Sequence, residues 1–107
     1  AIADSVIGLR SIVNSGAHLH RVVMMGADDF ESLAQIDENQ RLGLPDMGVG
    51  RGSVIESAIL DKNARIGRNV VIRDHTGAPD EETDNYVVRD GIVVIPKGAV
   101  IPDNTVI

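Results

Sequence analysis

Aliphatic residues recur every six positions along much of this chain. In one stretch they are Leu60, Ile66 and Ile72. Small or β-branched residues, Ala64 and Val70, stand four places after the first two. This pattern fits neither an α-helix, which repeats about every 3.6 residues, nor a strand, which alternates. A period of six is typical of a parallel β-helix, in which each unit is one short strand and a turn.

The period divides the chain into three repeat blocks and two interruptions. The blocks are residues 1–25, 49–73 and 91–107, and the interruptions are residues 26–48 and 74–90. We therefore predict an all-β fold over residues 1–107, a hexapeptide-repeat solenoid with two non-repeat inserts. Roughly three hexapeptides make one turn, which gives a triangular section. Because the ends of a solenoid expose strand edges, we expect caps or a partner there.

Each block has its own register. The inward aliphatic column of the first block is predicted to be Ala1, Ile7, Val13, Leu19 and Met25, with Ser5, Ser11, Ala17 and Val23 at the fourth places. In the second block, one five-residue side between Ile55 and Leu60 is needed to join two registers. The period resumes at Ile95 in the last block.

The first insert contains a helical pattern. Its acidic start predicts a helix of about two turns, with Asp28 or Asp29 as the N-cap and Leu33 inside it. Gly43 and Pro45 should end that helix. We expect this insert to fold back on the outside of the coil.

Composition supports a narrow core. Tyr86 and Phe30 are the only aromatic residues, and stacked coils leave little room for large rings. The absence of cysteine excludes disulfides and thiolate metal sites. No apolar run is long enough for a membrane span and no signal peptide opens the chain, so we expect a cytoplasmic protein with no membrane partner.

The net charge of −6 is unevenly distributed. The two inserts together carry a net charge of −10, so the coil carries +4. The start of the second insert, with Gly77, Pro79 and its acidic cluster, is therefore predicted to be a solvated loop. An acidic chain is not expected to bind nucleic acid. The basic coil would suit a small anionic ligand better than a polyanion.

Few residues suggest catalysis or metal binding. His18 and His20 lie two apart and are expected on the surface, and no third ligand accompanies them. His75 stands in the second insert, where it is a candidate general base for a hexapeptide acyltransferase. No metal site and no catalytic residue is otherwise predicted. Lys62 and Lys97 each follow an inward aliphatic residue by two places, so both should project outward from equivalent corners.

Several strings of the sequence resemble one enzyme family. They are Ser5–Ser11, Met24–Asp28, Asp61–Gly67, Asp90–Ala99 and Thr105–Ile107. These strings are similar, in order and over essentially the whole chain, to the C-terminal domain of glucose-1-phosphate adenylyltransferase (ADP-glucose pyrophosphorylase), closest to the plant and cyanobacterial type. The resemblance, and that to hexapeptide repeats in general, implies a left-handed β-helix, because periodicity alone does not set the hand.

The resemblance also implies a role. Enzymes of that family make ADP-glucose and pyrophosphate from ATP and glucose 1-phosphate, for glycogen or starch synthesis. ATP and Mg²⁺ would bind in an N-terminal catalytic domain, so this chain would be a non-catalytic C-terminal fragment without a cofactor of its own. Its partners would be that catalytic domain, further subunits of a homotetramer, and a phosphorylated metabolite effector.

By motif, Lys62 and Lys97 fall where two lysines of plant and cyanobacterial members contact the activator 3-phosphoglycerate. They are therefore our predicted effector-binding residues. Pro96 departs from the pattern and stiffens the backbone before Lys97. Two alternatives remain open: an acyltransferase that uses His75, and a purely structural solenoid.

Overall fold

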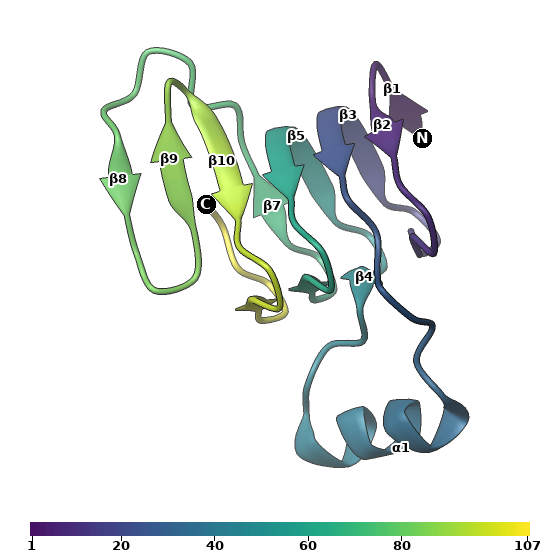
Figure 1. Ribbon diagram of the computed structural model, residues 1–107. Coiled ribbons are helices and arrows are strands. Elements are labelled where there is room, and N and C mark those ends of the chain that lie inside the picture. The colour runs from purple at the N-terminus through teal and green to yellow at the C-terminus, as the bar shows by residue number, and fades with distance from the viewer.

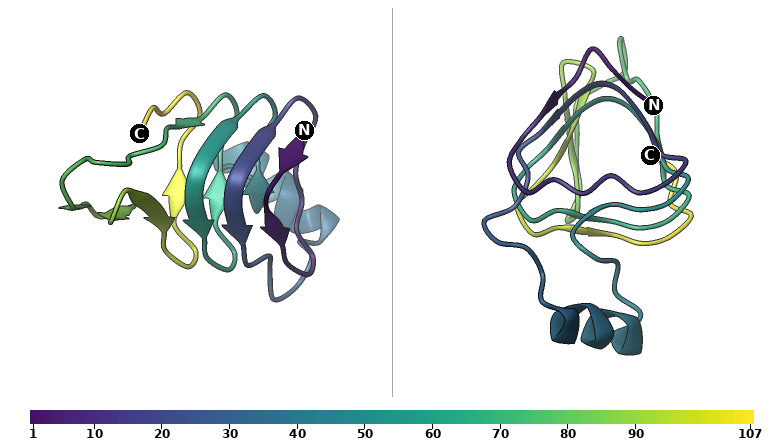
Figure 2. Two further views of the ribbon diagram at one scale, coloured as in Figure 1. Left: turned by 90° about the horizontal axis from the view of Figure 1, so that it is seen from above. Right: turned by 90° about the vertical axis from the view of Figure 1, so that its right-hand side faces the viewer.

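The chain coils into a three-sided prism with short strands on its sides. The computed structural model describes residues 1–107. Seen along the prism axis, the stacked coils have a triangular outline, with one helix outside it (Figure 2). The elements, most of which are labelled in Figure 1, are β1 (Ile2–Ala3), β2 (Val6–Ile7), β3 (His18–Met24), α1 (Leu33–Leu42), β4 (Gly48–Val49), β5 (Val54–Leu60), β6 (Arg65–Ile66), β7 (Val71–Ile72), β8 (Glu81–Glu82), β9 (Val87–Arg89), β10 (Ile92–Ile95) and β11 (Val100–Ile101).

The coils are joined by parallel pairing between strands one turn apart. β5 lies between β3 and β10, and β6 lies between β4 and β11. Within the second block Ile55 pairs with Ile72, so a coil without an insert is 17 residues long. These parallel ladders between successive coils confirm the predicted solenoid.

The core is a set of aliphatic columns that run along the axis. Val49, Ile66 and Ile101 stack in one column, and Leu60 and Ile95 stack in another. All five are essentially inaccessible to solvent. Each coil contributes one side chain to each column. The interior is therefore narrow and is filled by branched aliphatics rather than rings.

The predicted register of the first block is wrong after Leu19. Met24, not Met25, lies in the core: Met24 is 5% exposed and Met25 is 45% exposed. The reason is a five-residue side from Leu19 to Met24, the same shortened side that the sequence predicts from Ile55 to Leu60. The prediction also failed at Ala1 and Val23, which are exposed. Ile7 pairs with Met24 in the core column but is 36% exposed, because no further coil covers it.

The shortened side has a backbone cause. Asp4, Arg21 and Ser57 occupy equivalent places on three successive coils, and all three have a left-handed backbone, with φ of 50°, 55° and 48°. A residue with left-handed backbone dihedrals turns the chain more sharply than an extended residue. A side that contains one therefore needs one residue fewer to reach the next corner. Residues other than Gly, Asn and Asp rarely adopt this conformation, so at Arg21 and Ser57 the residue type does not indicate it.

The first insert contains helix α1, as predicted, but with a different cap. Ser32 is the N-cap, and its Oγ accepts a hydrogen bond of 3.1 Å from the Gln35 amide. Asp28 and Asp29 precede it and do not cap the helix. Gly43 ends the helix with φ of 71°, as expected. This helix is neither long nor apolar enough to cross a membrane.

The second insert is not simply a loop. β8 and β9 form an antiparallel hairpin, and β9 pairs with β10, so the insert extends the large sheet beyond the last full coil (Figure 1). Val88 pairs with Val93, and both side chains are fully buried. The acidic side chains at Asp80–Asp84 are exposed, as the solvated-loop prediction requires, but that prediction missed the strand at Glu81–Glu82. Val87 and Val88 were the signal for a strand at Val87–Arg89.

Candidate functional site

Lys62 and Lys97 lie on adjacent coils at the same corner of the prism. Each stands second in a four-residue turn, and the third residue of each turn is left-handed: Asn63 (φ 62°) and Gly98 (φ 69°). Asn and Gly are the residues that accept this conformation most readily. The Gly98 amide donates a hydrogen bond of 3.0 Å to the Lys62 carbonyl, which stacks the two turns.

One carboxylate joins the two lysines. Lys62 Nζ lies 3.3 Å from Asp28 Oδ1, and Lys97 Nζ lies 3.6 Å from Asp28 Oδ2. Asn63 Nδ2 also donates to Asp28 Oδ2, at 3.1 Å. We call Lys62, Lys97, Asn63 and Asp28 the lysine corner. The sequence predicted both lysines at equivalent corners but did not link Asp28 to them.

The contacts keep Asp28 ionised. Hydrogen bonds from the Asn63 side chain and then from Lys62 lower the pKa of the Asp28 carboxyl below its usual value. Burial opposes this effect, and the positive charges of both lysines add to it. The Asp28 amide in turn donates to Asn63 Oδ1, at 3.1 Å. Asn63 therefore holds both the backbone and the side chain of Asp28.

A second group of contacts anchors the insert that carries Asp28. Glu31 Oε2 lies 3.1 Å from Arg65 Nη1, and Glu31 also accepts hydrogen bonds from the Met47 amide and the Asn39 side chain. Burial alone would raise the pKa of Glu31, but these three partners together lower it. Arg65 also donates to the Pro45 carbonyl. Both ends of the insert are thereby fixed to the coil.

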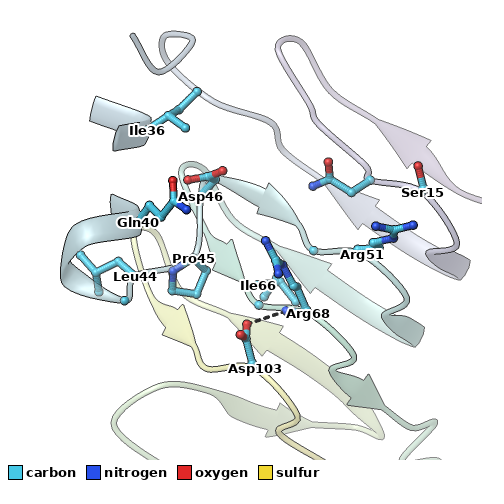
Figure 3. Close-up of a pocket in the computed structure, with 14 residues that line it drawn as sticks. Ser15, Ile36, Gln40, Leu44, Pro45, Asp46, Arg51, Ile66, Arg68 and Asp103 are labelled. Atoms are coloured by element: carbon cyan, nitrogen blue, oxygen red, sulfur yellow. Dashed lines mark hydrogen bonds between the residues drawn. The ribbon is translucent and has the colours of Figure 1, made fainter. Parts of the chain in front are cut away.

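A cavity lies away from the lysine corner. It has a volume of about 670 Å³ and separates the first insert from another corner of the coil (Figure 3). Arg51 and Arg68 line it, both exposed and neither in an ion pair, together with the carboxylates of Asp46 and Asp103. The Arg68 amide donates to Asp103 Oδ1 at 2.7 Å, which holds that carboxylate against the wall. The mixture of charges gives this cavity no clear preference for an anion.

The histidines do not form a site together. His18 and His20 are exposed on β3, and His20 Nε2 lies 3.4 Å from Asp4 Oδ2. Nowhere do three or more His, Asp or Glu side chains gather as a metal site. His75 Nε2 is shielded from solvent and has no hydrogen-bond partner. In this conformation Nε2 is not open to a substrate that could give up a proton.

Comparison with known families agrees with the fold. The model of the GLGC left-handed parallel beta-helix domain matches residues 1–106, nearly the whole chain. The match confirms the predicted left-handed β-helix and the resemblance found in the sequence strings. The chain therefore belongs to the family of left-handed β-helix domains found at the C-terminus of glucose-1-phosphate adenylyltransferase.

Proposed function

We propose that this chain is a regulatory and assembly domain of a glucose-1-phosphate adenylyltransferase, and that its lysine corner binds an anionic metabolite. The parent enzyme would transfer an adenylyl group from ATP to glucose 1-phosphate. ATP and Mg²⁺ would bind in a separate catalytic domain, and the domain alone would be non-catalytic. Its other partners would be that catalytic domain and further subunits of a cytoplasmic homotetramer.

The carrying observation is that Lys62 and Lys97 converge on one carboxylate. Ammonium groups on adjacent coils, within 3.3 and 3.6 Å of a single anionic group, form a place where an anion is already stabilised. Both side chains are about half exposed, so a small solute can reach them. The basic coil would add a weak long-range attraction for such a ligand.

Calorimetric titration of the chain with 3-phosphoglycerate and with orthophosphate tests the proposal. The substitutions Lys62→Gln and Lys97→Gln should each weaken binding about tenfold, because each removes one charge-assisted contact. Arg68→Gln is the matched control, since it removes one positive charge from another corner. Equal binding by the wild type and both lysine variants would exclude the lysine corner as the effector site.

The two alternatives make different predictions. A hexapeptide acyltransferase would turn over acetyl-CoA, and His75→Ala would abolish that turnover. A purely structural solenoid would bind neither phosphate compound. The buried Nε2 of His75 favours the regulatory proposal over the acyltransferase.

A further inference from the structure

We infer that Asp28 is a built-in occupant of the lysine corner, and that an anionic ligand binds there by replacing the Asp28 carboxylate. This inference rests on the proposed function and adds a mode of regulation to it. The ligand would not enter an empty site. It would compete with a side chain of the same protein.

The position of the carboxylate defines the class of ligand. Asp28 gives one oxygen to each lysine, Oδ1 to Lys62 and Oδ2 to Lys97. A replacement must therefore be an oxyanion with at least two acceptor oxygens on one centre. Carboxylates and phosphates meet this requirement, and the larger charge of a phosphate favours it over Asp28. Neutral sugars and cations do not meet it.

Asn63 is the third contact that such a ligand would use. Its Nδ2 donates to Asp28 Oδ2 at 3.1 Å, on the same oxygen that faces Lys97. Its Oδ1 stays occupied by the Asp28 amide, so the orientation of the side-chain amide is fixed independently of the carboxylate. When the carboxylate leaves, the Nδ2 donor remains aimed at the vacated position. The site then offers three donors to one anion.

The carboxylate can leave without moving the insert. The Asp28 side chain is 46% exposed, and ion pairs at such exposed positions are weak. Next to it, Arg10 Nε donates to the Ala27 carbonyl at 2.9 Å, and beyond it Glu31 is bound to Arg65. The backbone is thus held on both sides of Asp28. A rotation of one side chain is enough to open the site.

Competition of this kind lowers the apparent affinity. The ligand binds only the fraction of molecules in which the lysines are free, so its measured dissociation constant exceeds the intrinsic one. The substitution Asp28→Asn removes the competing charge and keeps the size of the side chain. It should therefore tighten binding of inorganic phosphate by about three- to tenfold, in keeping with the weakness of exposed ion pairs.

The control is the neighbouring acid. Asp29 is also exposed and makes no ion pair, so Asp29→Asn removes the same charge from the same insert without touching the lysines. Calorimetric titration of the 107-residue chain with inorganic phosphate at low salt compares the variants. Less than a twofold change in Asp29→Asn, beside tighter binding in Asp28→Asn, is the expected result.

Two outcomes would overturn the inference alone. Unchanged or weaker binding by Asp28→Asn, while Lys62→Gln still loses affinity, would mean that the ligand does not displace Asp28. Equal tightening by Asp28→Asn and Asp29→Asn would mean that general charge, not occupancy, sets the affinity. If neither lysine variant changes binding, the proposed function fails as well, and the inference with it.

Asn63 provides a second readout in the unmodified chain. Its side-chain amide signals in an NMR spectrum should shift when phosphate replaces the carboxylate. The side-chain amide of Asn14, which donates to the Val49 carbonyl in another part of the coil, should not shift. Unmoved Asn63 signals at saturating phosphate would contradict the inferred third contact.

Discussion

Arg65 of β6 and Glu31 of the first insert form the least exposed ion pair of the structure, with Nη1 and Oε2 3.1 Å apart and side chains 19% and 6% exposed. This pair joins a repeat-bearing strand to a segment that has no repeat. Glu31 also accepts a hydrogen bond from the amide of Met47, at the other end of the insert. One carboxylate therefore connects both ends of the insert and the coil. The insert is therefore fixed independently of what happens at Asp28.

Replacing Glu31 by Gln should lower the free energy of unfolding by about 1–3 kcal/mol. The substitution leaves Arg65 without its partner and removes the charge that three hydrogen-bond donors face, and losses of this size follow when a shielded charge loses its partner. Urea denaturation measures the change. Glu38→Gln is the control, because its pair with Arg41 lies on the exposed side of α1 and should contribute nothing measurable. Equal stability of the two variants would contradict the anchoring role.

Met24 and Met25 give a direct test of the coil register. Met24→Ala should cost about 2–4 kcal/mol, because it leaves a cavity in the column between Leu60 and Ile7. Met25→Ala should change stability by less than about 0.5 kcal/mol, since this side chain faces outward. Thermal or chemical denaturation of both variants measures the difference. The opposite order would restore the strict six-residue register and refute the five-residue side.

Gly50 tests how closely the coils approach. A Cβ at this position would overlap the carbonyl of Gly67 on the next coil, and backbone cannot move aside as a side chain can. Gly50→Ala should therefore destabilise the fold by about 3 kcal/mol. At Gly98 a Cβ meets nothing, and only the left-handed backbone (φ 69°) opposes a side chain, so Gly98→Ala should cost about 1 kcal/mol. A comparison by urea denaturation would show whether space or backbone conformation matters more.

Asp74 should make the fold sensitive to acid. Hydrogen bonds from the side chain and amide of Thr76, then from Ser57, with the charge of Arg21, lower the pKa of Asp74 to about 2. The folded carboxyl thus binds protons less readily than the unfolded one. Its stabilising contribution is complete above the ordinary value of 3.8 and is lost as the pH falls toward 2.

The substitution Asp74→Asn removes this contribution. Its free energy of unfolding should be lower than that of the wild type at pH 6 and should fall less steeply between about pH 4 and pH 2. Denaturant titrations over that range provide the measurement. Asp84→Asn should keep the wild-type slope, because Asp84 is exposed and forms no ion pair. Parallel curves for wild type and Asp74→Asn would contradict the prediction.

Periodicity predicted the β-helix but not every corner of it. The columns through Ile66 and Ile95 follow from aliphatic spacing, because each coil must place one side chain inward at each level. The short side before Met24 does not follow from it, since Arg21 adopts a left-handed backbone that its residue type does not favour. Pairing with the neighbouring coil, through Ile59 on Val23, holds that conformation in place.

The candidate site was predicted only in part, for a related reason. The repeat predicted that Lys62 and Lys97 each project outward from equivalent corners. It did not show that they share a face, because the second insert interrupts the period between them; the pairing of Ile95 with Leu60 in the structure places them together. Asp28 lies in a segment without a period, 34 residues before Lys62, and only the three-dimensional path of the insert brings it back to that corner. The repeat predicts contacts between successive coils. It does not predict which residues of an insert contact those coils.

The stacking of turns at the lysine corner has a consequence for how charge can be placed in space. The amide of each turn bonds to the carbonyl of the turn before, Ala27 to Leu9, Asn63 to Gly26 and Gly98 to Lys62, so one outward column runs the length of the prism. Successive places in that column are about 4.8 Å apart, the spacing of paired strands. The corner therefore offers one outward position per coil, at a fixed spacing. The substitution Leu9→Lys, at an exposed position, would place a lysine three coils from Lys97 and leave the core unchanged.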